Sequence, residues 1–322
     1  MSDGPRPNDS RLPEAPLVSV VLGTYNGETF LKEQLDSVLA QTYPNIEIVA
    51  VDDGSTDATV AILNEYAERD PRIKVYLNEK NLGFIKNFEK GIKLSKGHWI
   101  SVCDQDDYWF PEKIANMVRA IGDQPMVYCD SLLCGADLQP LGKKISDIVH
   151  YQSFDDCRQL CVFSRMYGHA TLVTRTLFEK ASPFIPEMPH DGWLAFHATL
   201  YGGVAYLPEA LVKYRQHASN VYGVVGGKSK RHDRLQRAER KKRELRRIRI
   251  RMNAFYEAVP DAMIPQKKLL GALVRSYRDF SPLNDIRRVA LFLTNYKLLL
   301  VVKRYPGWRK ILFCFKMLVK IK

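Results

Sequence analysis

Three aspartates fall within four positions in the stretch CDQDDYW, residues 103–109. Asp104, Asp106 and Asp107 directly follow HWISVC (98–103), which has the composition of a buried strand. Carboxylates this close together repel one another. A hard divalent ion, held by one or two carboxylates and by substrate phosphates, would neutralise them. The alternative is an acidic surface turn in which an aspartate caps the helix that follows.

Two further polar motifs follow apolar runs earlier in the chain. TYNG (24–27) comes after LVSVVLG (17–23), and DDGSTD (52–57) comes after IEIVAV (46–51). A small, glycine-flanked loop lets backbone and an aromatic ring approach a planar base, and carboxylates can bind a base and ribose. Each motif could equally be a plain turn that caps a helix. The chain has no G-x-G-x-x-G and no G-K-[ST] loop, which argues against a dinucleotide enzyme or a P-loop NTPase.

Strand-like and helix-like patterns alternate through the first half of the chain. The predicted strands are 17–23, 46–51, 73–77, 98–103 and 126–130, and amphipathic helical patterns lie between them. This alternation predicts an α/β fold with a doubly wound, mostly parallel sheet flanked by helices. In such sheets ligands bind outside the carboxyl ends of the strands, so the three polar motifs should line one crevice. From 131 to about 210 the pattern loosens, with strand candidates at 168–173 and 204–208.

Composition divides the chain into an acidic body and a basic tail. The 322 residues are 46% hydrophobic, enough for one substantial core and a smaller appendage. Residues 1–227 carry 21 Lys+Arg and 29 Asp+Glu, whereas residues 228–322 carry 27 and 7. Residues 1–15 are polar and proline-rich and are predicted to be a disordered leader without a signal region. The six cysteines have no metal or disulfide spacing, which favours reduced cysteines in a cytosolic protein.

The basic tail predicts contact with a membrane surface. Residues 228–251 contain 13 Lys+Arg and 3 acids, and residues 287–322 contain ten Lys+Arg and no acid. The apolar run 289–302 is too short to span a bilayer, but such helices can lie in the interface and bind anionic lipid. The alternatives are helices packed on the body with a solvated basic face, and a nucleic-acid site. We expect no nucleic-acid partner, because interleaved aromatic residues are lacking.

Four motifs in this order resemble family-2 inverting glycosyltransferases of the GT-A fold. They are SVVLGTYNG, VDDGSTD, NLGFIKNFEKGI (81–92) and DQDDYW, and the resemblance covers roughly residues 16–225. It implies a GT-A catalytic domain over 16–227 and a basic amphipathic helical tail over 228–322. The catalytic domain would divide into a nucleotide-sugar half (16–130) and an acceptor half (131–227).

The resemblance also implies roles for individual residues. The nucleotide-sugar-binding residues would be Thr24, Tyr25 and Asn26 in the nucleotide pocket, Asp53 on the base, Asp104 on the ribose or sugar, and Lys86 near the donor. Asp106 would be the carboxylate that binds Mg²⁺ or Mn²⁺ on the diphosphate, with Asp107 in support. The metal would act as a Lewis acid on the leaving group.

Inverting transfer also requires a base that takes the proton of the acceptor hydroxyl. Asp191, in PHDGW (189–193), occupies the position where the family carries this base. His190 stands where the family most often has an acidic residue, which leaves its role open. Asp191 could alternatively cap the helix that follows.

YRQHASN (214–220) resembles a Y-R-x-H-x-x-N segment of bacterial rhamnosyltransferase-like members. By that resemblance Arg215 would pair with phosphate, and His217 would ligate the metal or touch the diphosphate. GHA (168–170) matches a family loop on the acceptor side, where Gly168 allows close approach and His169 is a weaker candidate.

The expected function is metal-dependent transfer of a sugar from a nucleotide-diphosphate sugar, either dTDP-rhamnose or a UDP-hexose. The acceptor would be a surface polysaccharide or a lipid-linked glycan, and the protein would be cytoplasmic and peripheral to the inner membrane. Two alternatives stay open. One is a non-catalytic nucleotide-sugar-binding or scaffold protein. The other is a sugar-phosphate nucleotidyltransferase, which normally begins with a glycine-rich loop bearing Lys or Arg.

Overall fold

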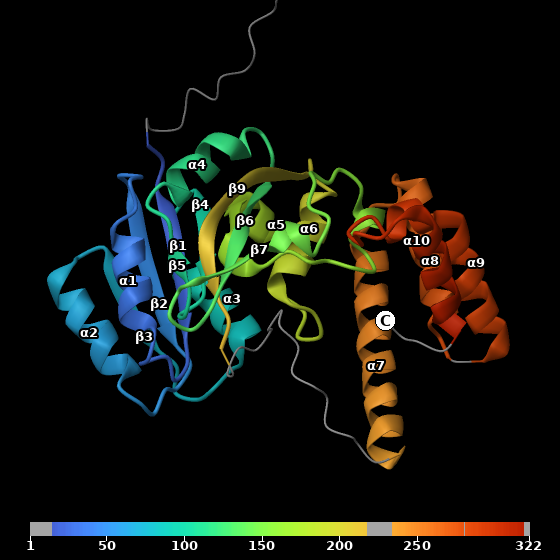
Figure 1. Ribbon diagram of the computed structural model, residues 1–322, viewed down its shortest axis with the longest axis horizontal. Coiled ribbons are helices and arrows are strands. Elements are labelled where there is room, and N and C mark those ends of the chain that lie inside the picture. Colours follow the sequence, from blue (N-terminus) through green and yellow to red (C-terminus); the bar gives the residue numbers. More distant parts are fainter. Residues whose placement is uncertain (1–14, 218–233, 280, 319–322) are drawn as a thin grey trace, which may run out of the picture.

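The computed structural model describes residues 15–217, 234–279 and 281–318. The predicted leader lies outside this range except for its last residue, as do the end of YRQHASN and the first part of the basic run. In Figure 1 the sheet and helices α1 to α4 form one side of the molecule. Helices α8, α9 and α10 form the other side, and α7 stands between them.

One nine-stranded sheet forms the framework, in the order β3-β2-β1-β4-β8-β6-β9-β5, with β7 paired to β6. The strands are β1 (Val18–Thr24), β2 (Ile46–Asp52), β3 (Ile73–Leu77), β4 (Trp99–Cys103), β5 (Tyr108–Trp109), β6 (Met126–Cys134), β7 (Pro140–Lys144), β8 (Thr171–Thr174) and β9 (Val204–Arg215). Strands β3, β2, β1 and β4 are parallel, as are β6 and β9. The antiparallel β8 joins these two parallel groups.

The helices that flank the sheet are α1 (Leu31–Leu39), α2 (Thr59–Arg69), α3 (Phe84–Leu94), α4 (Lys113–Ile121), α5 (Arg175–Ala181) and α6 (His190–Ala198). The tail contains α7 (Arg234–Ala258), α8 (Ile264–Ser276), α9 (Pro282–Leu299) and α10 (Gly307–Phe315). The five predicted strands and the alternation with helices are confirmed. The short β5 and the solvent-exposed β7 were not predicted, because neither carries a buried apolar run.

Alternation along β1 shows how the sheet separates two cores. Val20 and Leu22 point to the face covered by α1, where they pack with Leu35. Val21 points to the opposite face and packs with Phe88 of α3. The second core continues through α6 into the C-terminal helices, so burial of both faces holds the parallel strands in register.

The C-terminal helices belong to the core of the molecule. Phe255 of α7 is fully buried, and its ring centroid lies 3.9 Å from that of Phe196 and 5.8 Å from that of Trp193, both on α6. Ile248 and Met252 bury the same face of α7. This is the packed arrangement that the sequence left as an alternative. Among the described helices, none combines the length and apolar content that a membrane crossing requires.

We expect Phe255→Ala to destabilise the whole protein, because it removes a ring from a packed aromatic stack. The free energy of unfolding should fall by about 3 to 5 kcal/mol in a denaturant titration. Ile264→Ala on α8 is the control, since Ile264 is 70% exposed and should change stability by less than about 0.5 kcal/mol. Equal, small effects for both variants would show that α7 is not part of the cooperative core.

Candidate active site

Hydrogen bonds join the loops that follow β1, β2 and β4. The backbone N–H of Tyr25 donates to Oε1 of Gln105 at 2.8 Å, and Nε2 of Gln105 donates to the carbonyl of Tyr25 at 3.1 Å. Oδ1 of Asn26 accepts from the backbone of Thr56 at 2.9 Å, with Asn26 in the left-handed conformation at φ 48°. The hydroxyl of Thr24 donates to Asp52 at 2.9 Å. The TYNG, DDGSTD and DQDD motifs therefore form one rigid rim.

Asp53 holds the next loop against this rim. Its carboxylate accepts from the backbone N–H of Leu82 at 2.7 Å and of Gly83 at 2.9 Å, and from Nδ2 of Asn78 at 2.8 Å. Asp53 is 3% exposed, yet it borders the cavity described next. The observed contacts give it an organising role, and contact with a base stays a prediction.

A cavity of about 1170 Å³ opens beside these loops. Eight of the predicted site residues line it: Thr24, Tyr25, Asn26, Asp53, Asp104, Asp106, Asp191 and His217. Lys86 and Arg215 are not among its lining residues, and Lys86 lies on the exposed side of α3. The volume exceeds that of a typical small-ligand pocket, so there is room for a donor and an acceptor together.

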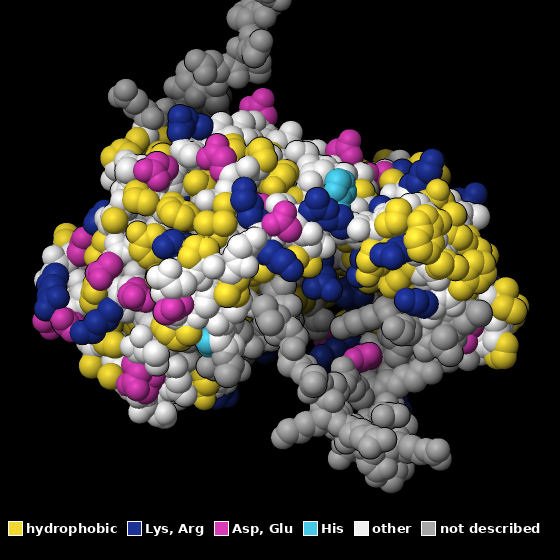
Figure 2. All heavy atoms as spheres, in the orientation of Figure 1, with side chains coloured by type: hydrophobic (Ala, Val, Ile, Leu, Met, Phe, Trp, Pro, Cys, Tyr) yellow, Lys and Arg dark blue, Asp and Glu magenta, His cyan; other side chains and the backbone are white. Residues whose placement is uncertain are grey.

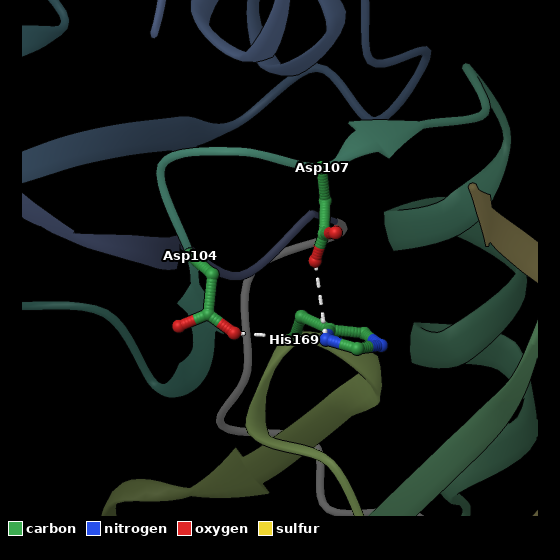
Figure 3. Close-up of side chains that lie close together, drawn as sticks. All are labelled: Asp104, Asp107 and His169. Carbon is green, nitrogen blue, oxygen red and sulfur yellow. Dashed lines mark ion pairs between the residues drawn. The ribbon is translucent and has the colours of Figure 1, made fainter. Parts of the chain in front are cut away.

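Asp104, Asp107 and His169 converge at the end of β4 (Figure 3). Nδ1 of His169 lies 3.1 Å from a carboxylate oxygen of Asp107 and 3.6 Å from one of Asp104. Burial raises the pKa of Asp107, and the neighbouring carboxylates of Asp106 and Asp104 raise it further. One ligand atom from each of the three residues lies within 4.8 Å of the others, which suits a divalent cation.

The predicted metal pair is also brought into contact. Nε2 of His217 lies 2.8 Å from Oδ2 of Asp106. Burial raises the pKa of Asp106, the charge of Asp104 adds to this rise, and His217 opposes it. Crowded carboxylates with raised pKa values, together with two imidazoles, fit the divalent cation that the GT-A resemblance implies.

Arg215 is a buried clamp beneath the DQDD turn. Its guanidinium donates to the carbonyl of Asp106 at 2.7 Å, to Glu33 at 2.5 Å and to the carbonyl of Ala136. Its backbone N–H donates to Asp107 at 3.1 Å. The sequence predicted a phosphate contact for Arg215, which stays untested. The contacts observed here fix the shape of the turn.

Asp191 lies in the first turn of α6, after the N-cap residue Pro189, so it is not the cap that the sequence offered as an alternative. The backbone N–H of Gly192 donates to its Oδ1 at 2.5 Å. Burial raises the pKa of Asp191 to about 7, although that hydrogen bond opposes the rise. A carboxylate that borders the cavity and titrates near neutral pH is well suited to act as a general base.

His190, whose role the sequence left open, packs among aromatic rings next to this carboxylate. Its ring centroid lies 4.8 Å from that of Phe88 and 6.2 Å from that of Phe184. Both ring nitrogens are buried and have no hydrogen-bond partner among the described residues, and burial lowers the pKa of His190 to about 4. A Cβ on Gly168 would lie 2.7 Å from Nε2 of His190, so only glycine fits there.

His169 is the site residue that sequence reasoning valued least. Its Nε2 lies 3.1 Å from the hydroxyl of Ser131, opposite the nitrogen that faces Asp107. The Ser131–His169–Asp107 line resembles a hydrolase triad, but Ser131 is buried and does not line the cavity. Ser131 therefore orients the imidazole of His169. The GHA motif was the only sequence signal for this residue.

Comparison with known proteins agrees with this geometry. The family model "Glycosyl transferase family 2" matches residues 19–181. An uncharacterized glycosyltransferase of Haemophilus influenzae is 29% identical over 244 residues, covering 71% of this chain and 73% of that protein.

Two solved structures share the fold. S. aureus TarS 1–349 in complex with UDP-GlcNAc has a TM-score of 0.54 at 16% identity, covering 93% of this chain and 89% of that one. The mannosyltransferase PcManGT of Pyrobaculum calidifontis, in complex with GDP-Man and Mn²⁺, has a TM-score of 0.54 at 18% identity, covering 94% and 86%. The predicted GT-A-type α/β fold is confirmed. Because the family model spans half of its residues, the chain belongs to glycosyl transferase family 2.

Proposed function

We propose that the protein transfers a sugar, with inversion, from a nucleotide-diphosphate sugar to a hydroxyl of a glycan or lipid-linked acceptor. One observation carries the proposal. The TYNG loop, Asp104 and Asp106 of the DQDD turn, and Asp191 all border the same cavity. Glycosyl transfer requires the donor-binding groups and the base to lie around the same anomeric carbon, and here both border one cavity.

The rim loops supply the donor site. Thr24, Tyr25 and Asn26 form a pocket for the nucleotide, with Asp53 on the base and Asp104 on the ribose or sugar. The half-exposed ring of Tyr25 is free to stack on a base, while its backbone is fixed by Gln105. Lys86 and Arg215 act on the donor from outside the cavity wall, Arg215 by holding the turn that carries Asp106.

The DQDD turn and its histidines would hold Mg²⁺ or Mn²⁺ on the diphosphate. Asp106 and His217 are the proposed ligands, and Asp104, Asp107 and His169 form an adjacent set. When bound, the cation stabilises the charge of the departing diphosphate as a Lewis acid. The two imidazoles favour Mn²⁺, since Mg²⁺ prefers oxygen ligands.

Asp191 is the proposed base. Its carboxylate takes the proton of the acceptor hydroxyl while the acceptor oxygen bonds to the anomeric carbon. The bond from that carbon to the diphosphate breaks on the opposite face, so the configuration inverts. Neutral His190 packs against Phe88, which also lines the cavity, and an apolar ring there favours attack by the acceptor over water.

The donor is proposed to be dTDP-rhamnose or a UDP-hexose. The solved relatives hold UDP-GlcNAc and GDP-Man, so hydrolysis of a panel of nucleotide sugars with Mg²⁺ or Mn²⁺ is the direct test. A non-catalytic scaffold would bind one of them without turnover. The raised pKa of Asp191 favours catalysis over that alternative, because a binding protein has no need of a carboxylate that titrates near pH 7.

We also propose that the protein works at the inner surface of the cytoplasmic membrane. Helix α10 exposes Trp308, Ile311, Leu312 and Phe315. Figure 2 shows hydrophobic side chains gathered over this C-terminal layer with Lys and Arg among them. Apolar side chains ringed by cations suit an anionic lipid surface.

Asp191→Asn should lower the transfer rate about 100-fold or more, because an amide cannot accept the proton. Donor affinity should stay unchanged by calorimetry. In the wild type kcat/KM should rise with pH through about 7, since only the carboxylate form of Asp191 is active and its pKa is raised. The exposed Asp123→Asn is the control. Normal turnover by Asp191→Asn would remove Asp191 from the mechanism.

EDTA should abolish turnover, and added Mn²⁺ should restore it. Asp106→Asn and His217→Gln should each raise the Mn²⁺ concentration for half-maximal activity about tenfold or more, with weaker Mn²⁺ binding by electron paramagnetic resonance. His98→Gln, on the surface, is the control. A larger effect for His169→Gln than for His217→Gln would place the metal on the Asp104–Asp107–His169 set. Turnover in EDTA would contradict the metal requirement.

The protein should float with vesicles that contain phosphatidylglycerol, and less at high salt, because cations near an anionic surface contribute on the order of 1 kcal/mol each. Replacing Trp308 and Leu312 with serine should reduce flotation strongly without lowering stability, since both are exposed. Leu141→Ser, on the exposed β7, is the matched control. Equal flotation of all three proteins would rule out α10 as the membrane contact.

A further inference from the structure

The cavity continues past Asp191 into a part that no donor motif lines. Its walls are the 160–167 segment, helix α7 and the residues around α10. Four basic residues line this part and define the basic pouch: Arg165, Arg247, Arg251 and Lys303. Figure 2 shows Lys and Arg side chains in the hollow between the catalytic body and the C-terminal helices.

Cations outnumber acids in the pouch. On this side of the cavity the acidic lining residues besides Asp191 are Glu187 and Glu244. Cations that outnumber the acids lining a cleft raise the local concentration of anions.

Arg251 lies in the pouch with a hydrogen-bond donor that has no acceptor in the described part of the chain. Its Nε is buried and has no hydrogen-bond partner among the described residues. Burial also lowers the pKa of Arg251, so the surroundings disfavour its charge. A buried guanidinium with an unused donor is costly unless an anion or ordered water binds it, and Arg251 is among the residues that line the cavity.

Lys303 is held in the same space by aromatic rings. Its Nζ lies 4.3 Å from the ring centroid of Phe163 and 5.5 Å from that of Phe313. Burial lowers the pKa of Lys303, and the positive charge of Arg165 lowers it further. Two cations that repel each other at close range are stabilised by an anion between them.

The pouch lies next to the proposed base. Burial raises the pKa of Tyr167, which hydrogen-bonds with Arg165 and also senses the charge of Asp191. Tyr167 thus connects the pouch to the base. The donor diphosphate belongs on the other side, at Asp106. An anion in the pouch would therefore be part of the acceptor.

We propose that the basic pouch binds a phosphoryl group carried by the acceptor, close to the hydroxyl that receives the sugar. This inference rests on the proposed glycosyl transfer and narrows its acceptor class. A tetrahedral phosphate offers oxygens in several directions and meets several cations at once, whereas a planar carboxylate is satisfied by one or two. The phosphate could come from a lipid-linked diphosphate or from a water-soluble phosphorylated glycan.

Calorimetry on the full chain in EDTA tests the pouch without the donor metal. The probes are inorganic pyrophosphate, and farnesyl diphosphate and farnesol in detergent. We expect the wild type to bind both phosphate probes and not farnesol. Arg247→Gln combined with Lys303→Gln should weaken binding about tenfold or more. Arg251→Gln should act likewise, and its melting temperature reports whether it folds.

The matched control is Arg246→Gln, an exposed arginine of α7 beside Arg247 that does not line the cavity. It should bind the probes as the wild type does. Tighter binding of farnesyl diphosphate than of pyrophosphate identifies a lipid-linked source, and equal binding a soluble one. Binding of farnesol as tight as farnesyl diphosphate, or unchanged binding in the double variant, overturns the proposal.

Donor hydrolysis without acceptor separates this inference from the proposed function. The double variant should hydrolyse the nucleotide sugar selected by the panel at the wild-type rate and with the wild-type KM. If the double variant lost donor hydrolysis as strongly as it loses probe binding, the pouch would belong to the donor diphosphate and the inference would be overturned. Absence of hydrolysis by the wild type with every donor would count against the glycosyl transfer, whereas probe binding would still measure the pouch.

Discussion

The DQDD turn depends on the contacts around its buried carboxyl group, that of Asp107, whose raised pKa favours the neutral form. Asp107 is fully buried, and taking a carboxylate out of water is costly unless partners replace the lost hydration. Arg215, His169 and the buried Lys113 surround the base of the turn. Nζ of Lys113 lies 3.1 Å from the Trp109 ring centroid, and burial lowers its pKa to about 8. These contacts fix the turn, so Asp104 and Asp106 face the cavity without having to hold it together.

This division of labour explains why two groups of carboxylates behave differently. Asp106 lies in a cluster of charges where a neighbouring histidine opposes the rise in its pKa, which suits a ligand for a cation. Asp191 lies at the start of α6, where burial is the largest cause of the rise in its pKa. One cavity therefore holds carboxylates in two different environments, as the proposed roles of cation ligand and base require. Different environments give such groups different pKa values, and this difference allows one carboxylate to act as a base and others as ligands.

The hydrophobic pattern of short segments was enough to predict the strands of the sheet. Continuous apolar runs gave the five strands, because strands buried on both faces need them. The position of DQDD directly after β4 predicted that this motif borders the ligand cavity. The clamp of Arg215 was out of reach, because its partners Glu33 and Ala136 are distant in sequence. His169 was undervalued for the same reason. The sequence left the packing of α7 against the body as an alternative, but it did not identify the partner Phe196, which lies elsewhere in the chain.

The acidic body and the basic tail of the sequence form two walls of the cavity. Asp104 and Asp106 line one wall, and basic residues of α7 line the other. Helix α7 buries Ile248 and Phe255 against the body while Arg247 and Arg251 face the cavity. A helix with a purely apolar inner face would have packed as well and left that wall uncharged. Placing guanidinium groups there costs stability, because the buried Nε of Arg251 has no hydrogen-bond partner in the part of the chain that the structure describes. Stability lost at one wall of a cavity is typical of a binding surface, because a ligand restores the missing interactions.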